Sequence, residues 1–286
     1  MTSVSIIGPN GQLGSDLVKV FTKASWKVFP ISHAEISVEN QQSVSGALMS
    51  AQTDWVINTA AFHKFDQCEK DSQKAWEINT YGAKNVATAA RELGMRTIFI
   101  SSDYVYSGDK GDSYSESDSV SPVNVYGHSK AGGEAVTLSV SEKNLVIRIA
   151  SVFGAAGSSG KGGNFVETII NKAKVGDPLS VVDDIFMSPT YAVDAAQKIL
   201  ELMNLDESGV FHATNSGSTT WFGFAQEILE QTKLSAKLSS SKTNWESASK
   251  RPRNSSLNIT KIENLLIDSP NWSDGLRRYL LEKNHI

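Results

Sequence analysis

A glycine-rich turn close to the first residue constrains the fold more than any other feature of the sequence. The preceding run, residues 3–7, is short and apolar, which indicates a strand, and apolar residues at helical spacing follow from residue 13. The turn between them contains Gly8, Asn10, Gly11, Gln12, Leu13 and Gly14. Glycines at such a junction let the backbone approach a pyrophosphate closely, and the helix that begins there offers free N–H groups to the anion. A tight turn without a ligand is the alternative, but the position directly between a strand and a helix favours dinucleotide binding.

The first half of the chain alternates between strand and helix patterns. After the first strand, further strands are expected at 26–31, 55–58, 96–101 and 145–150. Helices are expected between them, and the segment 72–93, ended by Gly94, has the clearest helical pattern. Strands that alternate with helices predict a parallel sheet covered on both faces, and the handedness of the crossovers makes it a Rossmann-like, doubly wound α/β fold.

The second half has a less regular pattern. Helical patterns near 164–174, 190–203 and 220–232, and an apolar run at 210–213, are accompanied by a glycine-rich loop at 155–163 and by a Ser- and Lys-rich stretch at 233–256 that we expect on the surface. We therefore expect a dinucleotide-binding core over 1–150, completed by about 188–213, and a smaller α/β substrate-binding lobe over 151–187 and 214–286.

Composition excludes several classes of function. The 286 residues carry a net charge of −4 with no long basic block, which argues against a nucleic-acid binder. A single cysteine, Cys68, rules out an intrachain disulfide and a cysteine-based zinc site, and we predict no metal site. No stretch approaches the ~20 apolar residues of a membrane span, and the first residues do not resemble a signal peptide. We therefore expect a cytoplasmic protein with no nucleic-acid or membrane partner.

The end of the second predicted strand bears on the choice of nicotinamide cofactor. An acidic side chain there would hold the 2′-hydroxyl of NAD and repel the 2′-phosphate of NADP. The sequence has Ser32 at this point, and the nearest carboxylate is that of Glu35. We therefore expect NADPH, with NADH as the alternative.

A tyrosine and a lysine four residues apart form the second chemical signal. On a helix, Tyr126 and Lys130 lie on the same side. A phenol with a pKa near ~10 is a poor base at neutral pH, but a nearby ammonium group stabilises its anion. Tyr126 can then exchange a proton with a carbonyl or alcohol oxygen, while Lys130 is also expected to bind the nicotinamide ribose. Such a pair often arises by chance on a surface helix, so its meaning depends on the residues around it.

Two polar residues support a catalytic interpretation of this pair. The predicted strand at 96–101 runs into Ser102, at the carboxyl edge of the sheet, where ligands bind in open α/β folds. Its hydroxyl can orient a substrate oxygen toward Tyr126, although serine is also a common turn residue. Asn79 lies inside a predicted helix, where it either holds a proton-relay water or has a structural role. Ser102, Tyr126 and Lys130 are thus the predicted catalytic residues.

The motifs together resemble those of dTDP-4-dehydrorhamnose reductases, which are extended short-chain dehydrogenase/reductases. The resemblance runs through nearly the whole chain and rests on residues 11–14 (GQLG), 58–61 (NTAA), 101–106 (SSDYVY), 122–127 (PVNVYG), 163–165 (GNF), 188–192 (SPTYA), 220–222 (TWF) and 251–255 (RPRNS). It implies reduction of a nucleotide-linked 4-keto-6-deoxy sugar by NADPH or NADH, with the three predicted catalytic residues in that role. By the same resemblance, the cofactor contacts Gln12, Ser32, Glu35, Ile36, Ala61, Phe62 and His63, and the sugar contacts Ser102 and Asp103.

Two segments of the substrate lobe depart from that family pattern. The family usually has a tryptophan where this chain has Ser151, and the sequence at 184–187 replaces a more usual Asp-Gln-Phe-Gly. Loss of an aromatic side chain removes a large apolar contact surface, so the substrate is expected to be dTDP-4-dehydrorhamnose or a related keto sugar. Asn164 and Arg251 are the remaining predicted substrate-binding residues, the arginine because its guanidinium can bind a phosphate through two hydrogen bonds.

The sequence is also compatible with two other functions. A non-catalytic regulatory subunit of the same fold, similar to that of methionine adenosyltransferase, would not need the intact set of Ser102, Tyr126 and Lys130. A sugar-nucleotide epimerase would retain its cofactor between turnovers, whereas a reductase must exchange it. We expect a homodimer for any of these functions.

Overall fold

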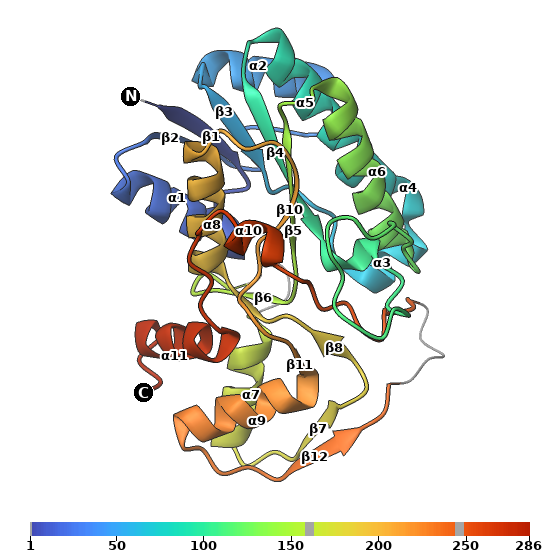
Figure 1. The fold of residues 1–286 in the computed structure, drawn as a ribbon, viewed down its shortest axis with the longest axis vertical. Coiled ribbons are helices and arrows are strands. Elements are labelled where there is room, and N and C mark those ends of the chain that lie inside the picture. The colour runs from blue at the N-terminus through green and yellow to red at the C-terminus, as the bar shows by residue number, and fades with distance from the viewer. Residues whose placement is uncertain (1, 158–162, 244–248) are drawn as a thin grey trace.

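A six-stranded sheet forms the centre of the molecule, in the order β10-β5-β4-β3-β1-β2 (Figure 1). The computed structural model describes residues 2–157, 163–243 and 249–286. The strands are β1 (Ser3–Ile7), β2 (Lys27–Ile31), β3 (Trp55–Asn58), β4 (Arg96–Ser102), β5 (Leu145–Ile149) and β10 (Gly209–His212). Every neighbouring pair is parallel. This arrangement confirms the predicted doubly wound α/β fold.

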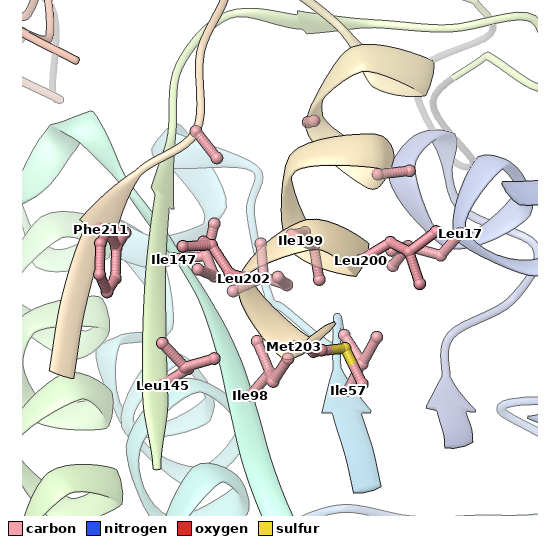
Figure 2. Packing of buried hydrophobic residues seen from close by; sticks show 14 of the residues in the cluster. Leu17, Ile57, Ile98, Leu145, Ile147, Ile199, Leu200, Leu202, Met203 and Phe211 are labelled. Atoms are coloured by element: carbon pink, nitrogen blue, oxygen red, sulfur yellow. The ribbon is translucent and has the colours of Figure 1, made fainter. Parts of the chain in front are cut away.

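Helices cover both faces of the sheet. One face carries α1 (Gln12–Lys23), α8 (Ala192–Asn204) and the short α10 (Thr260–Glu263), and the other carries α2 (Gln41–Ala51), α5 (Gly82–Glu92) and α6 (Val125–Val140). Neighbouring residues of one strand pack on opposite faces. Ile98 of β4 lies in one cluster with Leu17 of α1 and Ile199 of α8 (Figure 2), whereas Phe99 packs against α5 and α6. Because the side chains on both faces of the sheet are buried, the sequences of these strands are continuous apolar runs.

The segment 72–93 is not the single regular helix that the sequence predicts. It begins as α4 (Ser72–Trp76), passes through a π-helical turn (Glu77–Tyr81) and continues as α5; the short α3 (Phe65–Lys70) precedes it. A π turn takes up one extra residue, so the hydrophobic pattern shifts by one position without an interruption. The residue at the centre of this turn, Asn79, is fully buried.

The elements that carry a second hydrophobic cluster lie away from the main sheet, toward the lower end of Figure 1. Its elements are α7 (Phe165–Lys174), β7 (Leu179–Val182), α9 (Trp221–Thr232) and α11 (Trp272–Glu282). Short strands pair around it: β6 (Val152–Phe153) with β9 (Thr190–Tyr191), β8 (Phe186–Met187) with β11 (Thr219–Thr220), and β7 with β12 (Leu238–Ser241). The division of the chain into two functional domains stays a prediction.

The Ser- and Lys-rich stretch is only partly a surface segment, in contrast to the prediction. Its first part forms β12, and near its end Ser249, Ser255 and Ser256 are buried. Hydrogen bonds hold this end inside: the Tyr114 N–H donates to the Ser256 carbonyl at 2.8 Å. Ile259, just beyond it, packs in the main core although the sequence places this region in the substrate lobe. Residues 158–162 and 244–248, from the glycine-rich loop and from this stretch, lie outside the described part of the chain.

Among the described residues, no helix combines the length and the apolar character that crossing a membrane requires.

Candidate active site

The glycine-rich turn joins β1 to α1 at the carboxyl edge of the sheet. Gly8 has a φ of +81°, which favours glycine, and a Cβ on Gly14 would overlap the Gly8 carbonyl oxygen. Gly11 is the N-cap of α1, and among the described residues no side chain caps that first turn. Its main-chain N–H groups and the positive end of the helix dipole therefore form a cradle that fits a pyrophosphate.

The sheet changes direction beside this turn. The chain passes from β1 to β2 on one side and then to β3 on the other, which creates the crevice where dinucleotides bind in doubly wound sheets. Thr59, directly after β3, donates its hydroxyl to the Ile7 carbonyl at 2.6 Å. This bond brings the segment after β3, including Ala61 and His63, next to the glycine turn. The His63 ring nitrogen Nδ1 lies 3.3 Å from the Ala61 carbonyl oxygen.

Asn79 fixes the segment after β3 from the side of the π-helical turn. The Phe62 N–H donates to Asn79 Oδ1 at 2.8 Å, and Asn79 Nδ2 donates to the Phe62 carbonyl at 3.0 Å and to Ser129 Oγ at 2.9 Å. Both the oxygen and the nitrogen of the Asn79 side-chain amide are thus hydrogen-bonded within the protein. Of the two roles that the sequence left open, the structural one has these contacts in its favour.

Glu35 brings a carboxylate to the end of β2. The N–H and the hydroxyl of Ser32 donate to Glu35 Oε2 at 2.8 Å and 2.6 Å, and these hydrogen bonds lower the pKa of Glu35. The sequence placed no carboxylate at this strand end, because the turn that folds Glu35 back is not visible in a linear pattern. Ile36 follows and is buried against α2 and α5.

Ser102 and Tyr126 meet where β4 ends and α6 begins. Ser102 is the last residue of β4, and Tyr126 lies in the first turn of α6, which the Asn124 side chain caps by accepting the Gly127 N–H at 2.8 Å. Burial raises the pKa of Tyr126, and the neighbouring Ser102 hydroxyl opposes this shift with a smaller effect. The phenol of Tyr126 is therefore protonated at neutral pH.

Lys130 lies one turn further along α6, with an exposed fraction of 2%. Its Nζ donates to the Ile100 carbonyl at 2.6 Å and sits 4.0 Å from the centroid of the Phe99 ring. Burial lowers the pKa of Lys130 to about 7, and the charge of Glu134 opposes that shift. The expectation that the Lys130 ammonium group stabilises the anion of Tyr126 stays a prediction: in this structure burial raises the pKa of the phenol, and the lysine head group is bonded to β4.

A buried ion pair anchors the same helix to the sheet. Glu134 accepts from Arg148 Nε at 2.8 Å and from Nη2 at 2.6 Å, and it also accepts the Ser101 hydroxyl at 2.5 Å. The two residues are 14 positions apart, and no local pattern in the sequence indicates that they pair. The one signal is Arg148, a charged residue within the otherwise apolar strand β5. Because Glu134 lies one turn from Lys130, the pair helps to fix α6 on the sheet at the active site.

Asp103 is buried directly beside Ser102. Its Oδ1 accepts the Ser102 hydroxyl at 2.9 Å, and its Oδ2 accepts the Ser255 hydroxyl at 2.5 Å. Burial raises the pKa of Asp103 to about 6, although both hydrogen bonds lower it. The sequence singled out Asp103 but missed Ser255 as its partner.

Aromatic side chains form one wall of this corner. Phe65 and Tyr104 stack with ring centroids 4.5 Å apart, and Tyr104 meets Tyr126 edge to face at 5.9 Å. The guanidinium carbon of Arg251 lies 5.7 Å from the centroid of Phe65, so the predicted phosphate-binding arginine reaches the same corner. Phe65 and Tyr104 were not predicted as site residues, since isolated aromatic residues in a sequence do not indicate which of them are in contact.

The two remaining predicted substrate residues differ in their surroundings. Ser151 follows β5 in a left-handed conformation, with a φ of +43°, and is half-buried. Asn164 caps α7 by accepting the Glu167 N–H at 3.0 Å, and its Nδ2 donates to the Gly154 carbonyl at 3.2 Å and to Tyr279 Oη at 3.0 Å. These are structural contacts, and they occupy both ends of the Asn164 amide.

Comparison with known proteins places this chain in a family. Residues 1–284 match the family model described as the RmlD substrate binding domain. The spore coat polysaccharide biosynthesis protein SpsK of Bacillus subtilis (strain 168) is 35% identical over 99% of this chain and 99% of its own. The dTDP-4-dehydrorhamnose reductase of Aggregatibacter actinomycetemcomitans is 31% identical, over 97% of this chain and 98% of its own.

A solved structure agrees in the arrangement of the whole chain. The crystal structure of the dTDP-4-dehydrorhamnose reductase of Bacillus anthracis, in complex with NADP, superposes with a TM-score of 0.92 at 32% identity and covers 99% of this chain and 100% of that one. The chain therefore belongs to the RmlD substrate binding domain family, which confirms the resemblance to dTDP-4-dehydrorhamnose reductases drawn from its motifs.

Proposed function

We propose that this protein is an NADPH- or NADH-dependent reductase of a nucleotide-linked 4-keto-6-deoxy sugar, similar to dTDP-4-dehydrorhamnose reductase. The observation that carries this proposal is the meeting of Ser102 and Tyr126 at the sheet edge that also bears the glycine-rich turn. The reductases among its relatives, one of them bound to NADP, support the same reaction class.

The residues around the crevice suit a dinucleotide. The uncapped start of α1 would hold the pyrophosphate, and Ser32 and Glu35, at the end of β2, would lie near the adenine-side ribose. The segment of Phe62 and His63, held by Asn79, would line the cofactor beside the turn. When bound, the reduced nicotinamide supplies a hydride to the keto carbon.

Tyr126 would supply the proton that completes the reduction. As the carbonyl double bond opens, the oxygen takes up the electron pair and then the phenolic proton, which leaves an alcohol and a tyrosinate that solvent reprotonates. Burial raises the pKa of Tyr126 and so keeps the proton in place until the oxygen is basic enough to take it. Ser102 would orient that oxygen, and Lys130, rigidly held by Ile100, would bind the nicotinamide ribose.

Arg251 and the aromatic wall would recognise the rest of the substrate. The exposed guanidinium beside Phe65 is placed to bind a diphosphate, and Phe65 and Tyr104 offer apolar surface near it. Ser151 would leave more room for the sugar than a tryptophan, which favours a related keto sugar as well as dTDP-4-dehydrorhamnose. We further propose that the core over 1–150 and about 188–213 binds the cofactor, and that the protein is a homodimer.

A substrate panel tests this function. The purified chain is mixed with NADPH or NADH and with dTDP-4-dehydrorhamnose, dTDP-4-keto-6-deoxyglucose and their UDP counterparts, and the absorbance of the reduced nicotinamide is followed. We expect cofactor oxidation with at least one dTDP-linked keto sugar. Cofactor binding without oxidation on any member of the panel would support a regulatory subunit, and cofactor that stays bound through purification would support an epimerase. Light scattering on the eluted protein measures the oligomeric state.

A further inference from the structure

A buried chain of hydrogen bonds links the active-site serine to a serine from the C-terminal part of the protein. Ser102 Oγ donates to Asp103 Oδ1 at 2.9 Å, and Ser255 Oγ donates to Asp103 Oδ2 at 2.5 Å. The exposed fractions of Ser102, Asp103 and Ser255 are 7%, 4% and 2%. Hydrogen bonds to a buried carboxylate are stronger than those between neutral groups, so each donor matters to the charge on Asp103.

The Ser102 hydroxyl has a single proton, which it can donate either to Asp103 or to a substrate oxygen. That proton points at Asp103, while the oxygen accepts the Tyr104 N–H at 3.2 Å. Ser102 can therefore donate to a keto oxygen only when its proton turns away from Asp103. The carboxylate then loses one of its two side-chain donors and keeps the other, which is the Ser255 hydroxyl.

We propose that Ser255 is a positioning residue for keto-sugar reduction: by holding the second oxygen of Asp103, it lets the Ser102 hydroxyl turn from the carboxylate to the substrate. This inference rests on the proposed function, since it concerns the same reaction. Without Ser255, the buried carboxylate would retain the Ser102 proton more tightly, and orientation of the keto oxygen would cost more.

Main-chain bonds hold Ser255 in the place that this role requires. The Ser255 N–H donates to the Phe186 carbonyl at 3.0 Å, and the Asn254 N–H donates to the Gly108 carbonyl at 3.2 Å. The next residue, Ser256, accepts the Tyr114 N–H at 2.8 Å. The backbone on both sides of Ser255 is therefore pinned, and its hydroxyl is presented to Asp103 from a fixed position.

The role of Ser255 predicts a particular dependence on pH. The titratable groups that face this corner are Tyr104 beside Asp103, Tyr126 of α6 and Cys68 of α3, and Arg251 contributes a positive charge near Tyr104. A protonated Asp103 does not compete for the Ser102 proton, so a defect caused by loss of Ser255 should be large where Asp103 is ionised and should shrink as the pH falls through its pKa. A defect from misplaced backbone would be the same at every pH.

The experiment compares Ser255→Ala with a matched control in the same segment. Ser256→Ala is that control, because the Ser256 hydroxyl is also buried but donates to Asn254 Oδ1 at 2.6 Å. Together with Asp103→Asn and the double variant Asp103→Asn/Ser255→Ala, these measurements form a double-mutant cycle that tests whether the two residues act together. Rates on the keto sugar are measured with NADPH between about pH 5 and pH 9. Circular dichroism and NADPH titration establish that each variant is folded.

For Ser255→Ala we expect kcat to fall about 10-fold at the alkaline end, with KM changed less than about twofold. The defect should diminish at the acid end, and Ser255→Ala should add nothing in the Asp103→Asn background. Equal rates for Ser255→Ala and Ser256→Ala would overturn the inference, as would a defect that is independent of pH or additive with Asp103→Asn.

A measurement that needs no substrate separates this inference from the proposed function. The Asp103 carboxyl is titrated by carbon NMR in the wild type, in Ser255→Ala and in Ser256→Ala. We expect the pKa of Asp103 to rise in Ser255→Ala alone, because a donor to the carboxylate is lost. An unchanged pKa in Ser255→Ala would refute the contact even in an active enzyme. A wild type that reduces no keto sugar would refute the reductase assignment instead.

Discussion

The ammonium group of Lys130 donates to the Ile100 carbonyl at 2.6 Å, so a charged group of α6 is bonded to β4 in the middle of an apolar environment. Burial lowers the pKa of Lys130 to about 7 from a usual value of 10.5. The unfolded chain therefore binds this proton more readily than the folded one between those pH values. The contribution of Lys130 to the free energy of unfolding is therefore lowest at and below pH 7, and it rises as the pH increases toward 10.5.

Replacement of the lysine should separate stability from activity. We expect Lys130→Met to abolish turnover but to raise the free energy of unfolding at neutral pH by about 2 kcal/mol, since the desolvated charge is removed and one hydrogen bond is lost. Urea unfolding at two pH values measures this, and the gain should shrink near pH 10. Lys198→Met is the control, because Lys198 is equally buried, donates to the Thr214 carbonyl and lies in α8. The Lys198→Met variant should also be more stable than the wild type, but it should keep its activity. A lower free energy of unfolding in Lys130→Met would show that the buried lysine does not destabilise the fold.

Removal of the Tyr126 hydroxyl should affect the proton transfer alone. For Tyr126→Phe we expect kcat to fall at least ~100-fold while NADPH still binds, because a general acid contributes on that order to the rate. Stopped-flow or steady-state absorbance with the preferred keto sugar gives kcat, and fluorescence titration gives the affinity for NADPH. Tyr81→Phe, in an exposed part of the π-helical turn, is the matched control. Normal turnover by Tyr126→Phe would exclude this residue as the proton donor.

The glycine-rich turn predicts a sharp difference between two glycine substitutions. A Cβ at Gly14 would collide with the backbone of Gly8, whereas a Cβ at Gly46, in α2, meets nothing within 4 Å. Gly14→Ala should therefore lose NADPH binding at least tenfold and be less stable. Gly46→Ala should gain up to ~1 kcal/mol in the free energy of unfolding, because alanine is the better helix former. Thermal melts and cofactor titrations of both variants test this, and tight NADPH binding by Gly14→Ala would rule out the predicted packing of the turn.

The carboxylate at the end of β2 predicts a change in cofactor preference. Glu35 is ionised at neutral pH and would repel a 2′-phosphate, although two hydrogen bonds from Ser32 spread its charge. Glu35→Gln should raise the ratio of kcat/KM for NADPH to that for NADH by about fivefold, a change of ~1 kcal/mol in relative binding. Glu39→Gln, another exposed acid in the same connection, should leave the ratio unchanged. If Glu35→Gln does not alter the ratio, the carboxylate does not face the 2′ position.

Local patterns were sufficient to predict the parts of the fold that depend on neighbouring residues. The glycine-rich turn, the strand ending at Ser102 and the helix carrying Tyr126 and Lys130 each have a signal within a few residues. Once these elements form a parallel sheet, their carboxyl ends must lie at one edge. The sequence therefore predicted that these elements would meet at one edge of the sheet, which is where the candidate site lies.

The features that sequence reasoning missed depend on contacts between distant segments or on burial. The partner of Asp103 lies in a stretch whose composition indicated an exposed loop, whereas hydrogen bonds of its main chain and side chain hold Ser255 inside. Glu35 reaches the end of β2 through a turn, and the π-helical turn around Asn79 leaves the apolar pattern almost unchanged. Electrostatic surroundings were equally hidden, because the direction of a pKa shift follows from desolvation in the folded state.

The hydrogen bond between Asp103 and Ser255 joins positions that are 152 residues apart. A chain is synthesised from its N-terminus to its C-terminus, so the glycine-rich turn and Tyr126 leave the ribosome long before Ser255 does. During synthesis the Asp103 carboxylate therefore lacks its Ser255 donor until the C-terminal part of the chain has been made. The active-site corner is therefore complete only after the C-terminal part of the chain, which also supplies Ile259, Ile262 and Ile267 to the core of the main sheet, has been synthesised.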